Sequence, residues 1–335
     1  MKSSPIDLNG AAVLVTGGTG SFGRRFIKTV LARSKPRRLI VFSRDEMKQY
    51  EMAQEIGPTE CMRYFIGDVR DCDRLGLAMR EVDYVIHAAA LKQVPTAEYN
   101  PFECIHTNVL GAENVVRAAL RNEVKKVVAL STDKAASPIN LYGASKLASD
   151  KIFVAANNLS GSLGCRFSVV RYGNVLGSRG SVVPLFQRLL AEGADSLPIT
   201  DARMTRFWIT LQQGVDFVLS CMERMQGGEI FIPKIPSMRL VDLATAMAPA
   251  LPHRIVGIRP GEKLHEVMVT EDDARNTFDL GDCYVIEPAF QFSTDQTRIS
   301  DGIKPVPENF RYASETNTQW LDTAALRAIL SQATV

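Results

Sequence analysis

Residues 15–23, "VTGGTGSFG", place Gly17, Gly20 and Gly23 at intervals of three, directly after an apolar run and before a helical pattern. Glycines at this spacing permit a tight turn and let backbone amides approach a pyrophosphate, whose charge the following helix N-terminus stabilises. Such a turn alone is weak evidence, but in the first strand–helix turn of a long series it predicts a dinucleotide site. We expect this site to include Gly17, Thr19, Gly20, Ser21, Phe22 and Gly23.

The surrounding sequence supplies that series. Between residues 11 and 132, β-branched runs alternate with amphipathic stretches, which predicts successive strand–helix units and a parallel sheet. Residues 101–123 show helical spacing after a proline and predict one long crossover helix, residues 143–160 predict another helix, and "RFSVVRYG" predicts a sixth strand. The fold class is therefore α/β, a Rossmann-type doubly wound parallel sheet. The strands are expected in "AAVLVT", "RRLIVFS", "MRYFIGD", "VDYVIHA" and "VKKVVALS".

After Asn174 the composition changes, because Gly, Ser and Pro residues separate shorter predicted elements. This half predicts a smaller α/β substrate-binding domain. A helix and a short strand within residues 209–232 are expected to return to the first domain. We therefore assign residues 1–176 and 209–238 to the dinucleotide-binding domain and residues 177–208 and 239–335 to the second one. A last helix is expected with its cap at Thr323.

Bulk composition limits the possible partners. Thirty-nine Lys and Arg oppose 37 Asp and Glu, a net charge of +2, which argues against a nucleic-acid or membrane-surface protein. The six cysteines form no Cys-x-x-Cys pair and the four histidines lack ligand spacing, so we expect reduced thiols and no metal. No apolar run approaches the ~20 residues of a membrane span, and "AAVLV" is not followed by a cleavage site. The predicted location is the cytoplasm.

The end of the second strand, "VFSRDE", bears on the choice of dinucleotide. An acidic residue there would accept a hydrogen bond from a ribose hydroxyl of NAD, whereas an arginine would bind the 2′-phosphate of NADP. Ser43 and Arg44 occupy this place and favour NADP. If Arg44 instead pairs with Asp45 or Glu46, NAD stays possible. Asp68, after the third strand, is a candidate partner of the adenine amino group or a helix cap.

The stretch "STDKAASPINLYGASK", residues 131–146, carries the candidate chemistry. Tyr142 and Lys146 lie one helical turn apart and share a face. A neighbouring ammonium and a positive nicotinamide would lower the pKa of the Tyr142 phenol, which could then take the proton of a sugar hydroxyl while hydride leaves the same carbon. Tyr-x-x-x-Lys is a common chance pattern, but its place after the strand ending at Ser131 strengthens it.

With "GGTGSFG", "HAAA", the Ser131 region and "YGASK", the chain resembles the extended short-chain dehydrogenase/reductase superfamily. Through "FSRDE", "AALKQVPTAEYNPFE", "STDKAASPINLYGASK", "RYGNVLGSRGSVVP", "MTRFWIT" and "RPGEKLHE" it is similar, more narrowly, to the inverting UDP-N-acetylglucosamine 4,6-dehydratases of pseudaminic acid biosynthesis. The likeness covers nearly the whole chain up to about Glu287. Membrane-anchored relatives that retain C5 configuration carry Met in place of Tyr142, so the resemblance implies inversion.

The resemblance gives a role to Asp133 and Lys134. Once C4 of the sugar is a ketone, the C5 proton becomes acidic; a base removes it while an acid protonates the departing C6 hydroxyl. By resemblance Lys134 is the base, Asp133 the acid, and Thr132 a hydrogen-bond partner near O4. A lysine base must be neutral, which burial and neighbouring cations would promote. The division of roles within the pair stays open, and without the resemblance an inert ion pair is an equal alternative.

The resemblance also implies a nucleotide-sugar site, a wider cofactor site and a homo-oligomer. Arg206 and Arg259 fit a diphosphate, although each alone could be a solvated charge. His87 is predicted to be a hydrogen-bonded core residue. The expected substrate-binding residues are Lys92, Asn174, Thr200, Met204, Arg206, Arg259, Glu262, Ser314 and Asn317. Further cofactor contacts are expected at Val69, Ala88, Ala89, Lys92, Ser131, Tyr142, Lys146, Val175, Gly177, Ser178 and Arg179.

Two other functions share parts of this pattern. A UDP-N-acetylhexosamine 4-epimerase would use the dinucleotide, Tyr142 and Lys146, but needs no elimination and hence no Asp133–Lys134 pair. A redox sensor that binds NADP without turnover would not need Tyr142.

Overall fold

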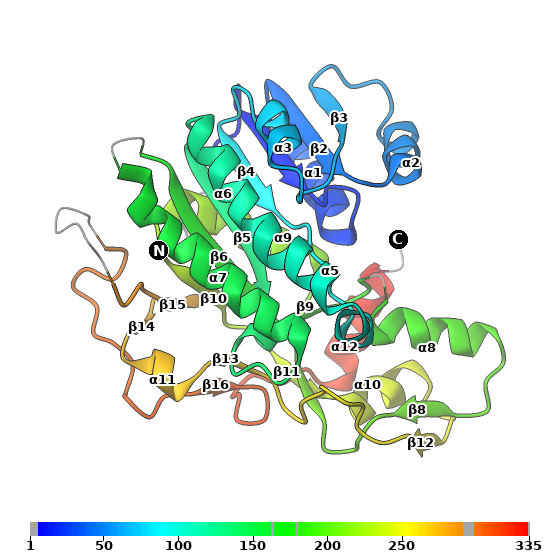
Figure 1. The fold of residues 1–335 in the computed structure, drawn as a ribbon. Coiled ribbons are helices and arrows are strands. Elements are labelled where there is room, and N and C mark those ends of the chain that lie inside the picture. The colour runs from blue at the N-terminus through cyan, green and yellow to red at the C-terminus, as the bar shows by residue number, and fades with distance from the viewer. Residues whose placement is uncertain (1–5, 162–163, 179, 291–297, 334–335) are drawn as a thin grey trace.

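A computed structural model describes residues 6–161, 164–178, 180–290 and 298–333. Its centre is a nine-stranded sheet of order β14-β15-β10-β6-β5-β4-β1-β2-β3 (Figure 1). Neighbours from β3 to β10 are parallel, and β15 and β14 are antiparallel. The predicted doubly wound parallel sheet is thereby confirmed. The strands are β1 Ala12–Thr16, β2 Arg38–Ser43, β3 Met62–Ile66, β4 Tyr84–His87, β5 Lys126–Thr132, β6 Arg166–Tyr172, β10 Ile230–Pro233, β14 Thr277–Asp279 and β15 Cys283–Ile286.

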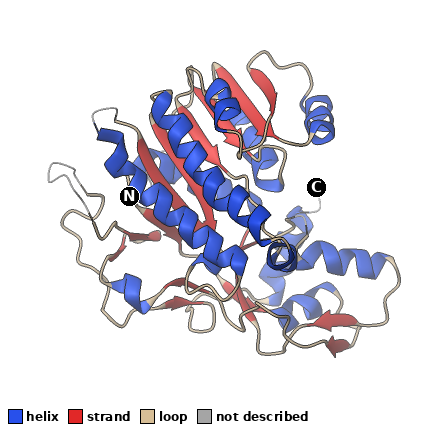
Figure 2. Cartoon of the chain, viewed as in Figure 1, coloured by secondary structure: helices blue, strands red, loops and turns tan. Residues whose placement is uncertain are grey.

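Helices cover both faces of this sheet (Figure 2). On one face α3 (Cys72–Ala78), α6 (Gly111–Arg121) and α7 (Leu141–Ser160) pack in a row; on the other α1 (Ser21–Arg33) packs on α9 (Leu211–Arg224). Because both faces are covered, the central strands are apolar runs rather than alternating ones, and every residue of β1 is buried. The strand order changes direction between β1 and β4, so the carboxyl ends of these strands form the crevice where ligands of such sheets bind.

The crossover expected as one helix over residues 101–123 is interrupted. It consists of α5 (Pro101–Ile105), a π-helical turn η1 (His106–Leu110) and α6, and it follows the short α4 (Val94–Tyr99). Buried Asn108 in η1 donates to the carbonyl of Leu91 (2.9 Å) and accepts from its amide (2.8 Å). A π-turn re-aims side chains within a helix, and here it clamps the loop after β4.

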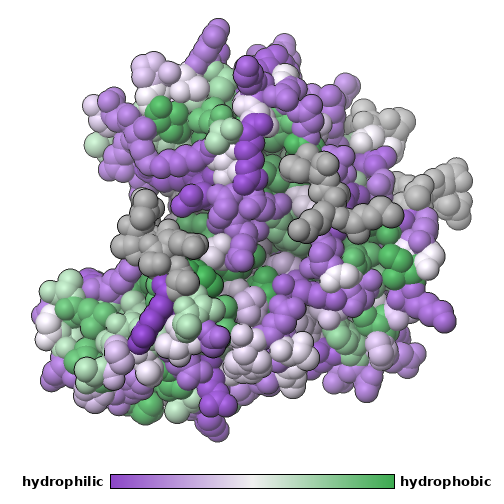
Figure 3. All heavy atoms as spheres, turned by 180° about the vertical axis from the view of Figure 1, so that it is seen from behind, coloured by the Kyte–Doolittle hydropathy of each residue, from purple (hydrophilic) through white to green (hydrophobic). Residues whose placement is uncertain are grey.

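A second lobe contains its own apolar core. Two small sheets, of order β11-β9-β7 and β12-β8, pack with α8 (Val182–Ala191), α10 (Leu240–Met247) and α12 (Thr323–Ala333) around Phe186, Trp208, Leu243 and Leu326. Seen from behind, an indentation separates this lobe from the large sheet (Figure 3). The strands are β7 Asn174–Val175, β8 Leu197–Ile199, β9 Thr205–Ile209, β11 Ser237–Arg239 and β12 His253–Ile255.

The remaining chain returns to the first core. The strands β13 (Val267–Val269) and β16 (Tyr312–Ala313) pair with each other, and the short helix α11 (Glu271–Ala274) follows β13. Met268, Val285 and Tyr312 pack in the large core. The helix α2 (Glu46–Ile56) lies between β2 and β3 in the chain. The pair β14–β15 adds to the large sheet, which corrects the placement of all of residues 239–335 in the second domain. α9 and β10 do return to that sheet. Asp322, not Thr323, caps α12, because its carboxylate accepts from the amide of Ala325 (2.7 Å).

Candidate active site

The glycine turn joins β1 to α1 with no room for side chains. Gly17 has φ of +64°, and a Cβ there would lie 2.9 Å from the Cα of Ala89. A Cβ on Gly23 would lie 2.5 Å from the Cα of Gly18, so α1 packs directly on the turn. The helix begins at Ser21 beside Gly20, which brings no side chain to the first turn. This bare helix start at the crevice fits the pyrophosphate of a dinucleotide.

The end of β2 carries the residues expected to select the dinucleotide. Thr19 in the glycine turn donates to the Ser43 hydroxyl (3.1 Å). The half-exposed Arg44 lies 3.6 Å from Asp68. Asp45 is the N-cap of α2 and pairs with Lys48, so the alternative in which it binds Arg44 is not observed.

Asp68 is not the cap of the next helix, since Asp71 caps α3. Its carboxylate is held by Arg70 through Nε (2.9 Å) and Nη2 (2.7 Å). Beside it Val69 is buried, and a Cβ on Gly111 would approach within 2.9 Å of its side chain. Asp68, Val69 and Arg44 thus lie together at the ends of β2 and β3.

The end of β4 lines the same crevice. The amides of Ala88 and Ala89 donate to the carbonyl (3.2 Å) and hydroxyl (3.3 Å) of Thr16, which places both alanines against the glycine turn. His87 is buried, shares a hydrogen bond with the Thr16 hydroxyl (2.8 Å), and burial lowers its pKa to about 3. The prediction of a core histidine is confirmed. Lys92 lies exposed on the loop that Asn108 clamps.

Tyr142 and Lys146 occupy the first two turns of α7. The helix begins after Asn140, whose side chain accepts from the amide of Gly143 (2.7 Å). Lys146 donates to the carbonyl of Leu130 (2.7 Å), and burial lowers its pKa, partly opposed by Asp150. Ser131 donates to Asp150 (2.8 Å). The two expected side chains are therefore fixed against the end of β5.

The electrostatics of Tyr142 differ from the expectation. Burial raises the pKa of Tyr142 to about 12, while Lys134 and a hydrogen bond with Thr132 act in the opposite direction. The cation that lowers the pKa of the phenol is thus Lys134 rather than Lys146. Burial of a phenol disfavours its anion, and this effect outweighs Lys134 and Thr132, which is why the expected net lowering of the pKa does not occur.

The Thr132–Lys134 segment lies beside Tyr142. Thr132 and Lys134, the latter in the short η2 (Asp133–Ala135), both donate to Oδ1 of the fully buried Asp133, at 2.9 and 3.1 Å. Oδ2 of Asp133 is buried without a hydrogen-bond partner among the described residues. The pair is brought to the phenol because the Gly143 position leaves no space for a Cβ, which would lie 2.3 Å from the carbonyl of Lys134.

Lys134 also contradicts the expectation of a readily neutral amine. Burial alone would lower its pKa, but Asp133 and Glu266, whose Oε1 lies 3.2 Å from Nζ, outweigh that effect and raise the pKa of Lys134. Arg206 acts in the opposite direction with a smaller effect. The resting pair is therefore an ammonium between two carboxylates.

The expected diphosphate ligands fall into two environments. Arg206 is buried and donates to the carbonyls of Thr205 (2.7 Å), Leu264 (3.0 Å) and Lys263 (2.9 Å), contacts that hold β9 to the chain before β13. Arg259 is exposed and pairs with Glu262 at 2.5 Å. Their roles toward a diphosphate stay predictions.

The Arg259 loop touches the catalytic helix. Asn140 donates to the carbonyl of Gly261 (2.7 Å), which ties this loop to the start of α7. Thr200 is buried directly after β8, and Met204 is buried in the second core. The structure thus brings the Arg259 loop, but not the Met204 side chain, to an open surface beside the catalytic residues.

Ser314 and Asn317 do not face an open site. Ser314 is fully buried, and its hydroxyl bonds the Thr205 hydroxyl (2.7 Å) and accepts from the Glu266 amide (2.9 Å). Asn317 is buried and donates to Ile235 (2.9 Å) and Ser237 (3.0 Å). Both side chains are enclosed by protein, and their contacts with a substrate stay predictions.

The segment expected at the nicotinamide follows β6. Asn174 and Val175 form β7, and Gly177 adopts φ of +70°. Ser178 bonds back to the carbonyl of Val175 (3.2 Å). A Cβ on Gly180 would lie 2.5 Å from the side-chain amide nitrogen (Nε2) of Gln93, so this segment lies against the loop that carries Lys92. Arg179 lies outside the described residues.

Sequence reasoning missed three residues of this site: Asn108, Asp150 and Glu266. Asp150 follows Lys146 by four residues on the same helix face, a signal that was available. It accepts from Ser131 and also from Arg171 (3.3 Å). Glu266 is distant in sequence from Lys134, and no spacing pointed to it. Among the described residues, no cluster of His, Cys, Asp or Glu could hold a metal ion.

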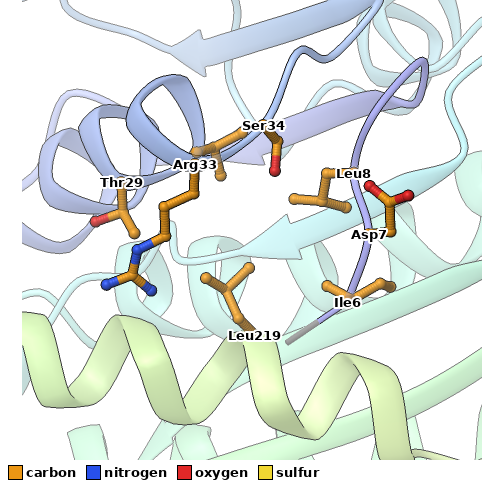
Figure 4. A pocket seen from close by; sticks show the side chains of 8 residues that line it. Ile6, Asp7, Leu8, Thr29, Arg33, Ser34 and Leu219 are labelled. Carbon is orange, nitrogen blue, oxygen red and sulfur yellow. The ribbon is translucent and has the colours of Figure 1, made fainter. Parts of the chain in front are cut away.

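A small pocket lies elsewhere, between the N-terminal segment, α1 and α9 (Figure 4). Its volume of about 180 Å³ is below that of a site for a nucleotide sugar. Arg33 on its wall is paired with Asp216 (2.6 Å). In the described part of the chain, no helix is both long and apolar enough to cross a membrane.

Comparisons with known proteins bear on this geometry. A family model described as "Polysaccharide biosynthesis protein" matches residues 13–288. The "UDP-N-acetylglucosamine 4,6-dehydratase (inverting)" of Campylobacter jejuni subsp. jejuni serotype O:23/36 (strain 81-176) is 57% identical over 328 residues, 96% of this chain and 98% of the relative. The "UDP-glucose 4-epimerase" of Rickettsia canadensis (strain McKiel) is 44% identical over 282 residues, 82% of each chain. The X-ray structure of Pen from Bacillus thuringiensis superimposes with a TM-score of 0.88 at 36% identity, covering 98% and 99% of the two chains.

Proposed function

The chain belongs to the family of polysaccharide biosynthesis proteins, and on this premise we propose that it is a UDP-N-acetylglucosamine 4,6-dehydratase that inverts C5. Its product would be UDP-2-acetamido-2,6-dideoxy-β-L-arabino-hex-4-ulose. The observation that carries the proposal is the ion pair between the buried Asp133 and the partly buried Lys134, which lies beside Tyr142 at the end of β5. An acid and a base next to the redox phenol are what elimination of water requires and what a simple dehydrogenase lacks.

Tyr142 begins the reaction. Its phenolate takes the proton of the C4 hydroxyl, while Thr132 hydrogen-bonds the same oxygen. The Lys134 ammonium and the Thr132 hydroxyl both favour the phenolate, although burial keeps the pKa of Tyr142 at about 12 before ligands bind. A dinucleotide held at the glycine turn would supply the hydride chemistry, which is acceptance from C4 and return to C6. Lys146, held by Leu130, adds a fixed positive charge on the same helix face.

Asp133 and Lys134 then act as one unit. Transfer of a proton from the ammonium of Lys134 to Oδ1 of Asp133, over 3.1 Å, produces the neutral amine and the carboxylic acid together. The amine removes the C5 proton, the acid protonates the departing O6, and water leaves. This pair is again ammonium and carboxylate after the elimination, so that step needs no external acid. When hydride returns to C6, C5 takes up one proton, and the proton that Tyr142 took from O4 balances it over the cycle. The second acid/base pair thereby has a function of its own.

NADP is our proposal for the dinucleotide. Three observations support it. Asp45, the acidic residue nearest the expected ribose position, caps α2. Arg44 is half-exposed, and Ser43 lies at the glycine turn. A planar guanidinium there can bind the 2′-phosphate with two hydrogen bonds. Arg259, Glu262 and Asn174 are proposed to bind the UDP-sugar.

We further propose that the enzyme works in the cytoplasm as a homo-oligomer, in a route to pseudaminic acid. The six cysteines all have free thiols, as is common in a reducing compartment. Tyr99 in α4 and Phe102 in α5 are 88% and 73% exposed, and large apolar side chains gathered on adjoining helices are typical of a protein interface.

A 4-epimerase is the second candidate, favoured by the identity to the Rickettsia relative. The two functions share C4 oxidation and differ in elimination. Incubation of the purified chain with UDP-N-acetylglucosamine and NADP, followed by mass spectrometry, separates them. We expect a product lighter by one water, whereas an unchanged mass with an epimerised sugar would establish the alternative. An absence of any product would favour a binding protein without turnover.

A further inference from the structure

Glu266 is a buried carboxylate beneath the catalytic pair. It lies directly before β13 and is 1% exposed. Its amide donates to the Ser314 hydroxyl (2.9 Å), and Ser314 in turn bonds Thr205 in β9 (2.7 Å). Oε1 of Glu266 lies 3.2 Å from Nζ of Lys134, while Oε2 is buried without a hydrogen-bond partner among the described residues. Burying a carboxylate costs free energy, and this cost is offset only where a nearby positive charge compensates it.

We propose that Glu266 is a positioning residue for dehydration: it holds the Lys134 amine as a second ion-pair partner beside Asp133, and thereby governs when that amine can act as a base. This inference rests on the proposed function and adds a residue to it. Glu266 touches neither sugar nor cofactor in the proposal and acts through Lys134 alone.

The charges around Lys134 support this role. Asp133 in η2 and Glu266 before β13 lie at 3.1 and 3.2 Å from Nζ, so the ammonium is shared between carboxylates from two elements. Arg206 in β9 lies 3.8 Å from Glu266, and Lys263, which donates to the Ala136 carbonyl, lies 3.9 Å from it. Tyr142 in α7 is the remaining titratable group that interacts with Lys134. The cluster therefore brings η2, β9, α7 and the segment before β13 together around one amine.

Two consequences follow for the chemistry. A second carboxylate stabilises the ammonium, which agrees with the raised pKa of Lys134, so the pair keeps its shared proton up to a higher pH than with Asp133 alone. The same contact stabilises the ammonium that forms again when the amine accepts the C5 proton. Glu266 thus restrains the base before the ketone forms and stabilises the product of proton abstraction.

The test is the pH dependence of dehydration in Glu266→Gln. Gln keeps the shape and removes the charge. Dehydration needs the proton that Lys134 and Asp133 share, so the rate falls at high pH as the pair loses this proton, and that limb should move to lower pH by about one unit or more. C4 oxidation, followed in a single turnover by the absorbance of the reduced nicotinamide, should keep its profile. A merely structural defect would lower both rates at every pH and leave the limb in place.

Two further variants keep the test decisive if Gln weakens the fold. Glu266→Asp retains the charge and should restore the wild-type limb. Lys263→Met removes a neighbouring cation and should move the limb to higher pH, the opposite direction. Glu229→Gln is the matched control: Glu229 is equally buried but bonds Ser168 (2.5 Å) and the Gln226 amide (2.6 Å), away from Lys134, so its limb should not move.

An unmoved limb in Glu266→Gln, in a protein that binds NADP and oxidises C4, would overturn the inference. Failure of the proposed function is distinguishable from this result, because the wild-type chain would then release no dehydrated product at any pH.

Discussion

Tyr142 takes part in the redox step of both the dehydratase and the 4-epimerase, and a binding protein without turnover would not need it. Burial raises the pKa of its phenol, and the cation that opposes this rise is the Lys134 ammonium, not Lys146. The sequence predicted the Tyr142–Lys146 pair from a one-turn spacing, but it could not predict which cation faces the phenol. That depends on η2 folding back over the start of α7, a contact between segments whose approach only tertiary packing sets.

Replacing Tyr142 by Phe tests its role as the proton acceptor. Removal of a positioned acid/base group typically costs 10²–10⁴-fold in rate, so we expect dehydration to fall by roughly that factor. Dinucleotide affinity should stay within about twofold, because the glycine turn is untouched. Turnover is measured by product mass spectrometry and binding by fluorescence quenching.

The matched control is Tyr64→Phe. Tyr64 lies in β3, and its hydroxyl is buried without a hydrogen-bond partner among the described residues, so its loss should leave turnover unchanged. Wild-type turnover in Tyr142→Phe would mean that another group takes the O4 proton.

At the scale of elements, η1, η2 and the start of α7 build the site. The strand–helix alternation predicted the sheet and most of its helices, because buried parallel strands are recorded as apolar runs in the sequence. The π-turn η1 was not predictable: within it the Asn108 side chain binds the backbone of Leu91, a tertiary contact that helical spacing does not record. Glu266 was missed for a related reason, since its contact to Lys134 joins segments far apart in the chain.

Gly143→Ala tests whether the packing of η2 on α7 positions the catalytic pair. The new Cβ would lie 2.3 Å from the Lys134 carbonyl and 3.1 Å from Pro138, so η2 must move. Overpacking of this kind costs about 1–3 kcal/mol of unfolding free energy. A displacement of about 1 Å at the pair can lower turnover by about 10²-fold. Thermal unfolding and product formation measure the two effects.

Gly214→Ala in α9 is the control for that experiment. A Cβ at Gly214 meets nothing within 4 Å, so alanine should stabilise the helix by roughly 0.5–1 kcal/mol and leave turnover unchanged. If Gly143→Ala behaved like Gly214→Ala, the close approach of η2 to α7 would not position the pair.

At the scale of the whole molecule, two cores meet at the crevice. The strands of the large core position the glycine turn, His87 and Lys146. The second core packs around Trp208 inside the second lobe. The change in composition after Asn174 predicted a second unit, yet β14 and β15 return to the large sheet. Short antiparallel strands at a sheet edge carry little sequence signal, which is why that return was not predicted.

The central claim is that Tyr142 and the Asp133–Lys134 pair act in one cycle in which hydride leaves C4 and comes back at C6. The most direct measurement is the position of hydrogen isotopes in the product after a first turnover in heavy water, read by nuclear magnetic resonance. We predict one solvent deuterium at C5, delivered after Lys134 has removed the original proton, and the hydrogen of C4 at C6. Solvent deuterium at C6, or an undeuterated C5, would contradict the account.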